Sequence, residues 1–291
     1  MNPAVTAPPT APAALLDGFS LEMTGKDVAA LEEARPGIPD GTRVNITFLA
    51  GEDTPARLAA ARAVKHLGLV PVPHISARRL GHHRDLAEFL SGLAADGTGE
   101  HVLVVGGDPA TPEGPYEDAL AVLRSGLLPA HGVRHVGITG YPEGHPAIAE
   151  DALWTALADK SALLDAQGLT GEIVTQFGFD ADTVLDWIAA VRARGVRLPV
   201  RVGVPGPAGV RRLMTYATRF GVGTSASIAR KYGFSLTHLM GTAGPDRFLR
   251  ALEAGHDPAR HGRVRAHFYT FGGLAATSAW VREFRAAHGT R

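Results

Sequence analysis

EIVTQFGFDADTVLDWIAAVRARGVRLPVRVGV, residues 172–204, contains the unit that decides the fold. It begins with a short run rich in apolar and β-branched residues, continues with apolar residues at helical spacing, and returns to a second apolar run. Asp180 is a typical residue to begin the helix, and Gly195 is a typical residue to end it. A strand, a helix and a second strand in this order predict two parallel strands joined by a crossover helix.

The same alternation runs along most of the chain. Eight short apolar runs, bounded by Gly, Pro or polar residues, are predicted as strands. They are FSLEM (19–23), VNITFL (44–49), VPVPHI (70–75), HVLVVG (101–106), HVGITG (135–140), EIVTQF (172–177), PVRVGV (199–204) and VRAHFYTF (264–271). Eight strands over 291 residues favour closure into a (β/α)8 TIM barrel. An open doubly wound sheet is the alternative, although the sequence has no GxGxxG motif after the first run and no P-loop.

Helix boundaries are predicted between several of these runs. Thr54 is expected to cap a helix that has Pro55 at its first position and ends at Gly68. Asp85 is expected to cap a second helix over residues 86–93. Residues 228–254 are predicted to form two or three helices in place of one.

Composition limits the classes of function. The chain has no cysteine, which excludes disulfides, thiolate metal sites and a cysteine nucleophile. Its formal net charge of +0 offers no electrostatic attraction for nucleic acid or an anionic membrane. The Ala/Pro-rich residues 1–17 are predicted as a disordered tail and residues 18–291 as one barrel domain. Without a secretory signal or a run of roughly 20 apolar residues, we expect a soluble, cytoplasmic protein.

Polar residues gather where the predicted strands end, which is where active sites of parallel barrels lie. They are Glu22, Thr47, His74, Asp108, Tyr141, Glu143, His145, Gln176 and Tyr269. Each also has a structural interpretation: Glu22 as a solvated rim residue, His74 and Gln176 as hydrogen-bonded core residues, and Asp108 as a turn or cap. Their shared position at one rim favours a functional site.

Two common kinds of catalytic site are disfavoured. The thirteen histidines include no H-E-x-x-H pattern, and His101, His131 and His135 lie near predicted strand starts, at the opposite end of the barrel. The sequence also has no G-x-S-x-G motif for a serine nucleophile. We therefore expect neither a metal hydrolase nor a serine hydrolase.

Six motifs occur in a characteristic order between residues 19 and 271. The most specific are GYPEGHP (140–146), VTQFGFD (174–180) and HFYTF (267–271), and the weaker ones are SLE (20–22), VPHIS (72–76) and GGDP (106–109). In this order they resemble the methylenetetrahydrofolate reductase family, in a divergent bacterial type with a single catalytic domain.

The resemblance implies a reaction and a set of site residues. In this family reduced FAD passes hydride to 5,10-methylenetetrahydrofolate, giving 5-methyltetrahydrofolate, and NAD(P)H reduces the flavin again. Glu22 corresponds to the general acid, which at neutral pH requires a raised pKa. Asp108 corresponds to an acid near flavin and pterin, and Gln176 and Tyr269 to the substrate side. The implied flavin- or nucleotide-binding positions are Thr47, Phe48, Ala50, His74, Gly106, Gly107, Tyr141 and His145.

The chain departs from the family pattern where charge is expected. Gly106 stands where the family usually has an arginine, and Ala162 and Leu163 stand where it has basic residues that meet the flavin diphosphate. Gly272 and Gly273 follow HFYTF, where the family has an arginine for the folate tail. Two alternatives therefore stay open: a flavin-independent folate oxidoreductase with direct hydride transfer from NAD(P)H, and a non-catalytic folate- or nucleotide-binding barrel. The resemblance alone is compatible with a homo-oligomer.

Overall fold

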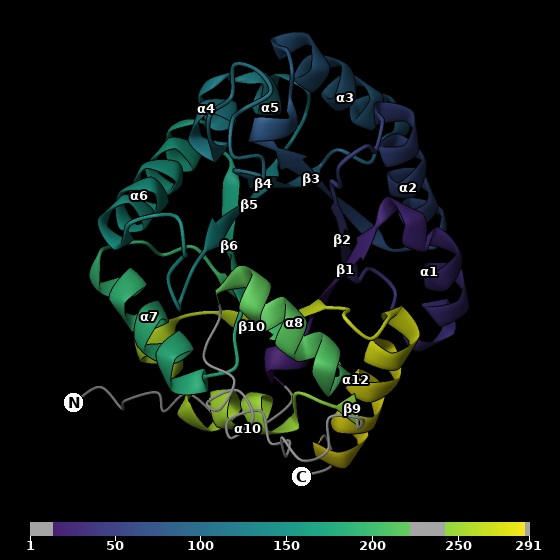
Figure 1. The fold of residues 1–291 in the computed structure, drawn as a ribbon, viewed down its shortest axis with the longest axis vertical. Helices are drawn as coiled ribbons and strands as arrows, with labels where there is room; N and C mark the ends of the chain where they lie inside the picture. The colour runs from purple at the N-terminus through teal and green to yellow at the C-terminus, as the bar shows by residue number, and fades with distance from the viewer. Residues whose placement is uncertain (1–13, 222–241, 289–291) are drawn as a thin grey trace, which may run out of the picture.

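Eight parallel strands close into a barrel surrounded by helices (Figure 1). The computed structural model describes residues 14–221 and 242–288. The barrel strands are β1 (Ser20–Thr24), β2 (Arg43–Thr47), β3 (Val70–Ser76), β4 (His101–Val105), β5 (His135–Gly140), β6 (Thr170–Phe177), β7 (Val200–Pro205) and β10 (Val264–Tyr269). β1 pairs with β10 through Ser20 opposite His267, so the sheet has no open edge. The predicted (β/α)8 barrel is confirmed, and the open doubly wound sheet is wrong.

The helices follow the strands in the predicted rhythm. The longer ones are α1 (Val28–Ala34), α2 (Thr54–His66), α3 (His83–Asp96), α6 (Glu150–Ala166), α7 (Ala181–Ala193), α8 (Val210–Phe220), α10 (Asp246–Gly255) and α12 (Leu274–His288). Shorter helices are α4 (Ala119–Arg124), α5 (Leu127–Ala130) and α11 (Pro258–His261). A small hairpin pairs β8 (Ala208–Gly209) with β9 (Thr242–Ala243). None of the described helices is both long and apolar enough to cross a membrane.

Alternation along the strands separates the two faces of the barrel wall. In β1, Leu21 and Met23 are buried in the main apolar core, which also contains residues of the surrounding helices. Ser20 and Glu22 lie on the other face, because successive side chains of a strand point to opposite sides. Glu22 pairs in register with Asn45 of β2. The inside of the barrel therefore carries polar groups from neighbouring strands in common layers.

Two predicted helix caps are wrong by one to three residues. Thr54 is the first residue of α2, and the cap is Asp53, whose carboxylate accepts the Ala56 N–H at 2.9 Å. Asp85 lies inside α3, which begins two residues earlier, and its carboxylate accepts the His82 N–H at 2.8 Å. In both places the acidic side chain meets a free N–H group of the first turn, which several neighbouring positions can do.

The other predicted boundaries agree with the structure. Asp180 precedes α7, with its carboxylate accepting the Thr183 hydroxyl at 2.7 Å, and Gly195 follows this helix with φ of 83°. Gly68 follows α2 with φ of 72°. This left-handed backbone favours glycine, which explains why both helices end there.

Residues 14–17, which we predicted as part of the tail, belong to the barrel. Ala14–Leu16 form a 3-10 turn, η1, in which Leu15 and Leu16 are buried in the main core. These two apolar side chains offset the entropy of ordering the segment. Residues 1–13 lie outside the described residues. Residues 228–241, which belong to the region predicted to form two or three helices, also lie outside the described residues. In the rest of that region the structure has one helix, α10.

Candidate active site

The Glu22 side chain lies between two imidazole rings inside the barrel. Its Oε2 atom is 3.4 Å from Nε2 of His267 and 4.0 Å from Nε2 of His74. The Glu22 side chain is 20% exposed, whereas that of His267 is fully buried. The other ring nitrogen of His267 is 2.9 Å from the Ser20 hydroxyl. The two ring nitrogens of His267 thus connect Ser20 to the Glu22 carboxylate, with Nε2 placed to donate to Glu22.

The pKa of Glu22 results from opposing effects. Burial raises it, but the hydrogen bond from His267 and the charges of His74 and His267 together lower it below the ordinary value. The raised pKa that we expected for Glu22 is therefore wrong, since the prediction included burial and omitted the imidazoles. Burial lowers the pKa of His74 to about 4, although the charge of Glu22 acts in the opposite direction.

Three buried polar atoms beside Glu22 have no hydrogen-bond partner among the described residues. They are Oδ1 of Asn45, Oγ1 of Thr47 and Nε2 of His74, from β2 and β3. An unsatisfied buried polar group costs about 1–3 kcal/mol, and such groups are uncommon in native proteins. They identify this side of the barrel as a place where a polar ligand would complete the hydrogen bonding.

Arg57 of α2, which the sequence analysis did not single out, supports two predicted site residues. Its guanidinium lies 3.7 Å from the ring centres of both Phe48 and Phe89. It also donates to the backbone carbonyl of His74 at 2.7 Å. Burial lowers the pKa of Arg57 to about 9. This one side chain therefore joins the loop after β2 to the end of β3.

Replacing Arg57 by methionine is expected to destabilise the fold by about 2 kcal/mol, because two cation–π contacts and a buried hydrogen bond are lost. The matched control is Arg62→Met on the same helix. Arg62 is half exposed and pairs with Asp96, so its loss should cost less than about 1 kcal/mol. Urea unfolding of the two variants measures the difference. Equal stabilities would contradict a supporting role for Arg57.

Asp108 lies in the loop after β4, directly after Gly106 and Gly107. Gly107 has φ of 98°, and a Cβ atom there would lie 2.4 Å from the Ser76 hydroxyl. The loop therefore requires glycine at this position. The Asp108 side chain is 69% exposed and forms an ion pair with Arg79. Its neighbour Gly106 has open space around its Cα, with no atom within 4 Å of a Cβ built there.

Of the two residues predicted on the substrate side, Tyr269 contacts the group around Glu22, whereas Gln176 bonds to its own strand. The Tyr269 ring contacts His267 edge-on at 5.0 Å, and its hydroxyl donates to the Thr175 carbonyl at 3.1 Å. The pKa of Tyr269 is raised well above its ordinary value. Burial has the largest effect, and the charges of Glu22 and Tyr141 add to it. Gln176 instead accepts the backbone N–H of its neighbour Phe177 at 3.0 Å, where the register of β6 shifts.

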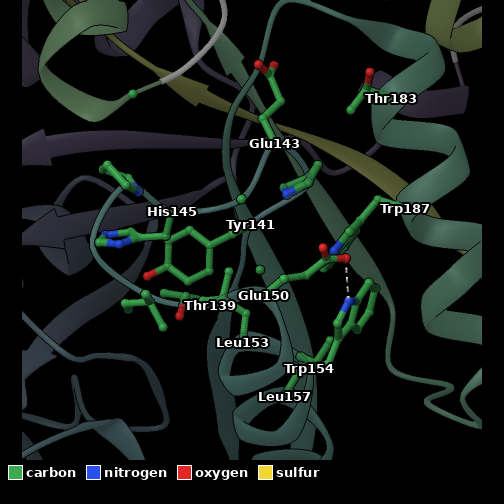
Figure 2. A pocket seen from close by; sticks show the side chains of 16 residues that line it. Thr139, Tyr141, Glu143, His145, Glu150, Leu153, Trp154, Leu157, Thr183 and Trp187 are labelled. Carbon is green, nitrogen blue, oxygen red and sulfur yellow. Dashed lines mark hydrogen bonds between the residues drawn. The ribbon is translucent and has the colours of Figure 1, made fainter.

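Tyr141 and His145 line a cavity of about 590 Å³ between the loop after β5 and helices α6 and α7 (Figure 2). Their rings contact edge to face at 5.3 Å. Trp154 and Trp187, stacked at 5.9 Å, form another part of the lining. Within the described chain, the predicted site residues thus divide between the barrel interior and this lateral cavity.

The charges at the cavity are acidic. Glu143 and Glu150 contribute to its lining, and Glu150 accepts the Trp154 indole N–H at 3.1 Å (Figure 2). Among the described residues, no lysine or arginine lines it. Lys160, the nearest basic residue along α6, is buried, and burial lowers its pKa to about 8. No group of three His, Asp or Glu side chains in the described part of the chain is arranged to hold a metal ion.

Comparisons with known proteins add sequence and fold evidence. No protein-family model matches the chain. A 69-residue stretch, 24% of this chain and 11% of the relative, is 33% identical to methylenetetrahydrofolate reductase 2 of Saccharomyces cerevisiae (strain ATCC 204508 / S288c). An uncharacterized protein from Clostridium thermocellum that binds two copies of 5-methyl-5,6,7,8-tetrahydrofolic acid superposes with a TM-score of 0.61, at 11% identity, over 95% of this chain and 98% of that one. At that identity the second match shows the fold alone. The protein is thus a (β/α)8 barrel whose resemblance to the methylenetetrahydrofolate reductase family is confirmed.

Proposed function

We propose that this barrel interconverts 5,10-methylenetetrahydrofolate and 5-methyltetrahydrofolate by hydride transfer, with NAD(P)H as the hydride source. The observation that carries the proposal is the Glu22 carboxyl group, held between His267 and His74 inside the barrel mouth. The similarity to the yeast reductase supplies the substrate class. The matched stretch covers a small part of that enzyme, so its activity enters here as a proposal.

Glu22 is assigned the proton transfer. In the reductive direction the protonated carboxyl group donates to N10 of the folate as the bond between N10 and the methylene carbon breaks. Hydride adds to the resulting iminium carbon at N5, so one proton and one hydride convert the methylene into a methyl group. The carboxylate left on Glu22 accepts a hydrogen bond from His267. A bound folate would exclude water and strengthen the burial effect that raises the pKa of Glu22.

FAD as hydride carrier is the first candidate for the cofactor. The unsatisfied atoms of Thr47 and His74 fit the polar edge of a flat ring. The cavity at Tyr141 and His145 does not fit a diphosphate, because Glu143 and Glu150 face it without a described cation. FAD, when bound, would accept hydride from NAD(P)H and deliver it to folate. The second candidate needs no flavin: hydride would pass directly from NAD(P)H to the folate.

An absorption experiment separates these candidates. We expect anaerobic NADH to be oxidised on addition of 5,10-methylenetetrahydrofolate in either case. If the protein binds FAD, flavin absorption will bleach with NADH and recover with the folate. If it does not, a colourless protein will oxidise NADH in the presence of the folate alone. Binding of folate without any NADH or NADPH oxidation would refute the oxidoreductase and leave a non-catalytic binding barrel.

A further inference from the structure

Three arginines lie at the end of the barrel where its strands begin, and we call them the basal arginines. Arg43 is the first residue of β2, Arg201 the second of β7 and Arg265 the second of β10. Arg265 lies opposite Arg201 in the register of the two strands, so their side chains project from the same face of the sheet. The basal arginines therefore belong to the end of the barrel opposite the rim where the predicted site residues lie.

Contacts bring these guanidinium groups close to one another. Oε2 of Glu172 accepts from Arg43 and from Arg201, each at 2.8 Å. Arg201 also donates to the Gly18 carbonyl at 2.9 Å. The guanidinium carbon of Arg265 lies against the same glycine, 3.3 Å from the position that a Cβ atom there would take. Arg201 thus shares Glu172 with Arg43 and lies beside Arg265 at Gly18.

The basal arginines carry more charge than the described residues around them compensate. Within the described chain, Glu172 is the carboxylate at ion-pair distance from them. Arg265 forms neither a hydrogen bond nor an ion pair with any described residue, so its guanidinium donors are unused there. Three guanidinium groups and one carboxylate leave an excess of two positive charges.

This excess charge disfavours the charged form of Arg265 in the folded protein. Burial lowers the pKa of Arg265, and the charges of Arg263, Arg201 and Arg43 lower it further, against the opposing charge of Glu172. A base with a lower pKa in the folded than in the unfolded protein destabilises the fold when it is charged. Arg263 is exposed and the Arg43 side chain is 24% exposed, so solvent reaches the basal arginines. An anion bound there would offset the repulsion and accept from Arg265.

We infer that the basal arginines form a binding site for a phosphate group, either as the free ion or on a small phosphate ester. A phosphate monoester carries about −1.5 to −2 charges at pH 7, which matches the excess positive charge better than a single carboxylate does. Its oxygens also fit the planar, bidentate donors of guanidinium groups. The site lies at the opposite end of the barrel from Glu22 and does not depend on the proposed folate reaction.

Binding of inorganic phosphate tests the site. Dissociation constants are measured by titration calorimetry at constant ionic strength, so that screening is equal in every titration. Arg265→Met keeps the apolar stem and should weaken phosphate roughly tenfold or more, because a charged donor is lost. Arg265→Lys keeps the charge without the planar fork and should weaken phosphate by about threefold. The control is Arg84→Met, at an exposed residue near the start of α3 that pairs with Glu88, which should leave the constant unchanged.

Unfolding provides a readout that a merely structural arginine would not give. In chloride buffer without phosphate, Arg265→Met should unfold at a higher urea concentration than the wild type, because it removes repulsion among the basal arginines. Phosphate should then raise the urea midpoint of the wild type more than that of the variant, since only binding to the folded protein stabilises it.

Glycerol 3-phosphate and acetate decide the class of ligand. Tighter binding of glycerol 3-phosphate than of inorganic phosphate identifies an ester as the ligand, and the reverse order identifies the free ion. Acetate that binds as tightly as phosphate overturns the phosphate assignment. The site itself is overturned if the wild type binds neither phosphate ligand, or if Arg265→Met binds phosphate as the wild type does. Should Arg265→Met fail to fold, as judged by circular dichroism, Arg265→Lys decides by the same titrations.

Discussion

Replacing Glu22 by glutamine is expected to slow the NAD(P)H-dependent reduction of 5,10-methylenetetrahydrofolate by about 10²- to 10⁴-fold. Glutamine has nearly the same size and can still accept a hydrogen bond from His267, but it has no acidic proton to give to N10. Affinity for 5-methyltetrahydrofolate should stay within about threefold, because the change is nearly isosteric. Single-turnover rates and titration calorimetry measure the two quantities separately.

A second glutamate controls for the substitution itself. Glu33 is exposed on α1, so Glu33→Gln should leave both rate and affinity unchanged. If Glu22→Gln turns over at the wild-type rate, Glu22 is not the acid. If affinity falls while the single-turnover rate at saturating substrate keeps its wild-type value, Glu22 binds the substrate in its ground state and the proton comes from another group.

The sequence predicted the barrel because its evidence is local and repeated. Each strand–helix unit, such as residues 172–204, is recognisable from a change in apolar periodicity. The rule that strand ends meet at one rim then placed Glu22, His74 and Tyr269 near one another, and the structure brings these three together around His267.

The chemical state of the site could not be predicted in the same way. Ser20 and His267 are 247 positions apart and meet because β1 closes the barrel against β10. His267 also forms a hydrogen bond with Glu22, which is why burial alone gave the wrong pKa direction. A signal was present, because alternation along HFYTF puts His267 and Tyr269 on one face of the strand.

The burial and the partners of several arginines could not be predicted from local sequence patterns either. Arg57 lies on an amphipathic helix where a charged residue is ordinarily exposed, yet it is buried between two phenyl rings. Arg78 and Arg79 are neighbours in sequence, and the structure gives them backbone and carboxylate partners respectively. The contacts of a long side chain depend on how the fold places it, and the spacing of residues in the sequence does not predict those contacts.

At the opposite end of the barrel, one carboxylate balances two arginines. Oε2 of Glu172 accepts from Arg43 and from Arg201, each at 2.8 Å. The Arg201 side chain is 2% exposed and also donates to the Gly18 carbonyl at 2.9 Å. Burial raises the pKa of Glu172, but Arg201 and Arg43 outweigh it and lower the pKa below the ordinary value of 4.5. This cluster joins β2, β6 and β7 across the barrel.

Glu172→Gln is expected to reduce the free energy of unfolding by about 3 kcal/mol at pH 7, because it leaves two neighbouring guanidinium groups without their counter-charge. The folded pKa of Glu172 lies below its unfolded value, so the stabilisation is complete above pH 4.5 and is lost as pH falls through the folded pKa. The gap between wild type and variant should therefore be constant near neutral pH and close in acid. Glu100→Gln, at an exposed glutamate near the same end, should cost less than about 1 kcal/mol. Urea unfolding from pH 3 to 8 measures both. A gap that persists unchanged in acid would mean that Glu172 stabilises the barrel by packing and not by its charge.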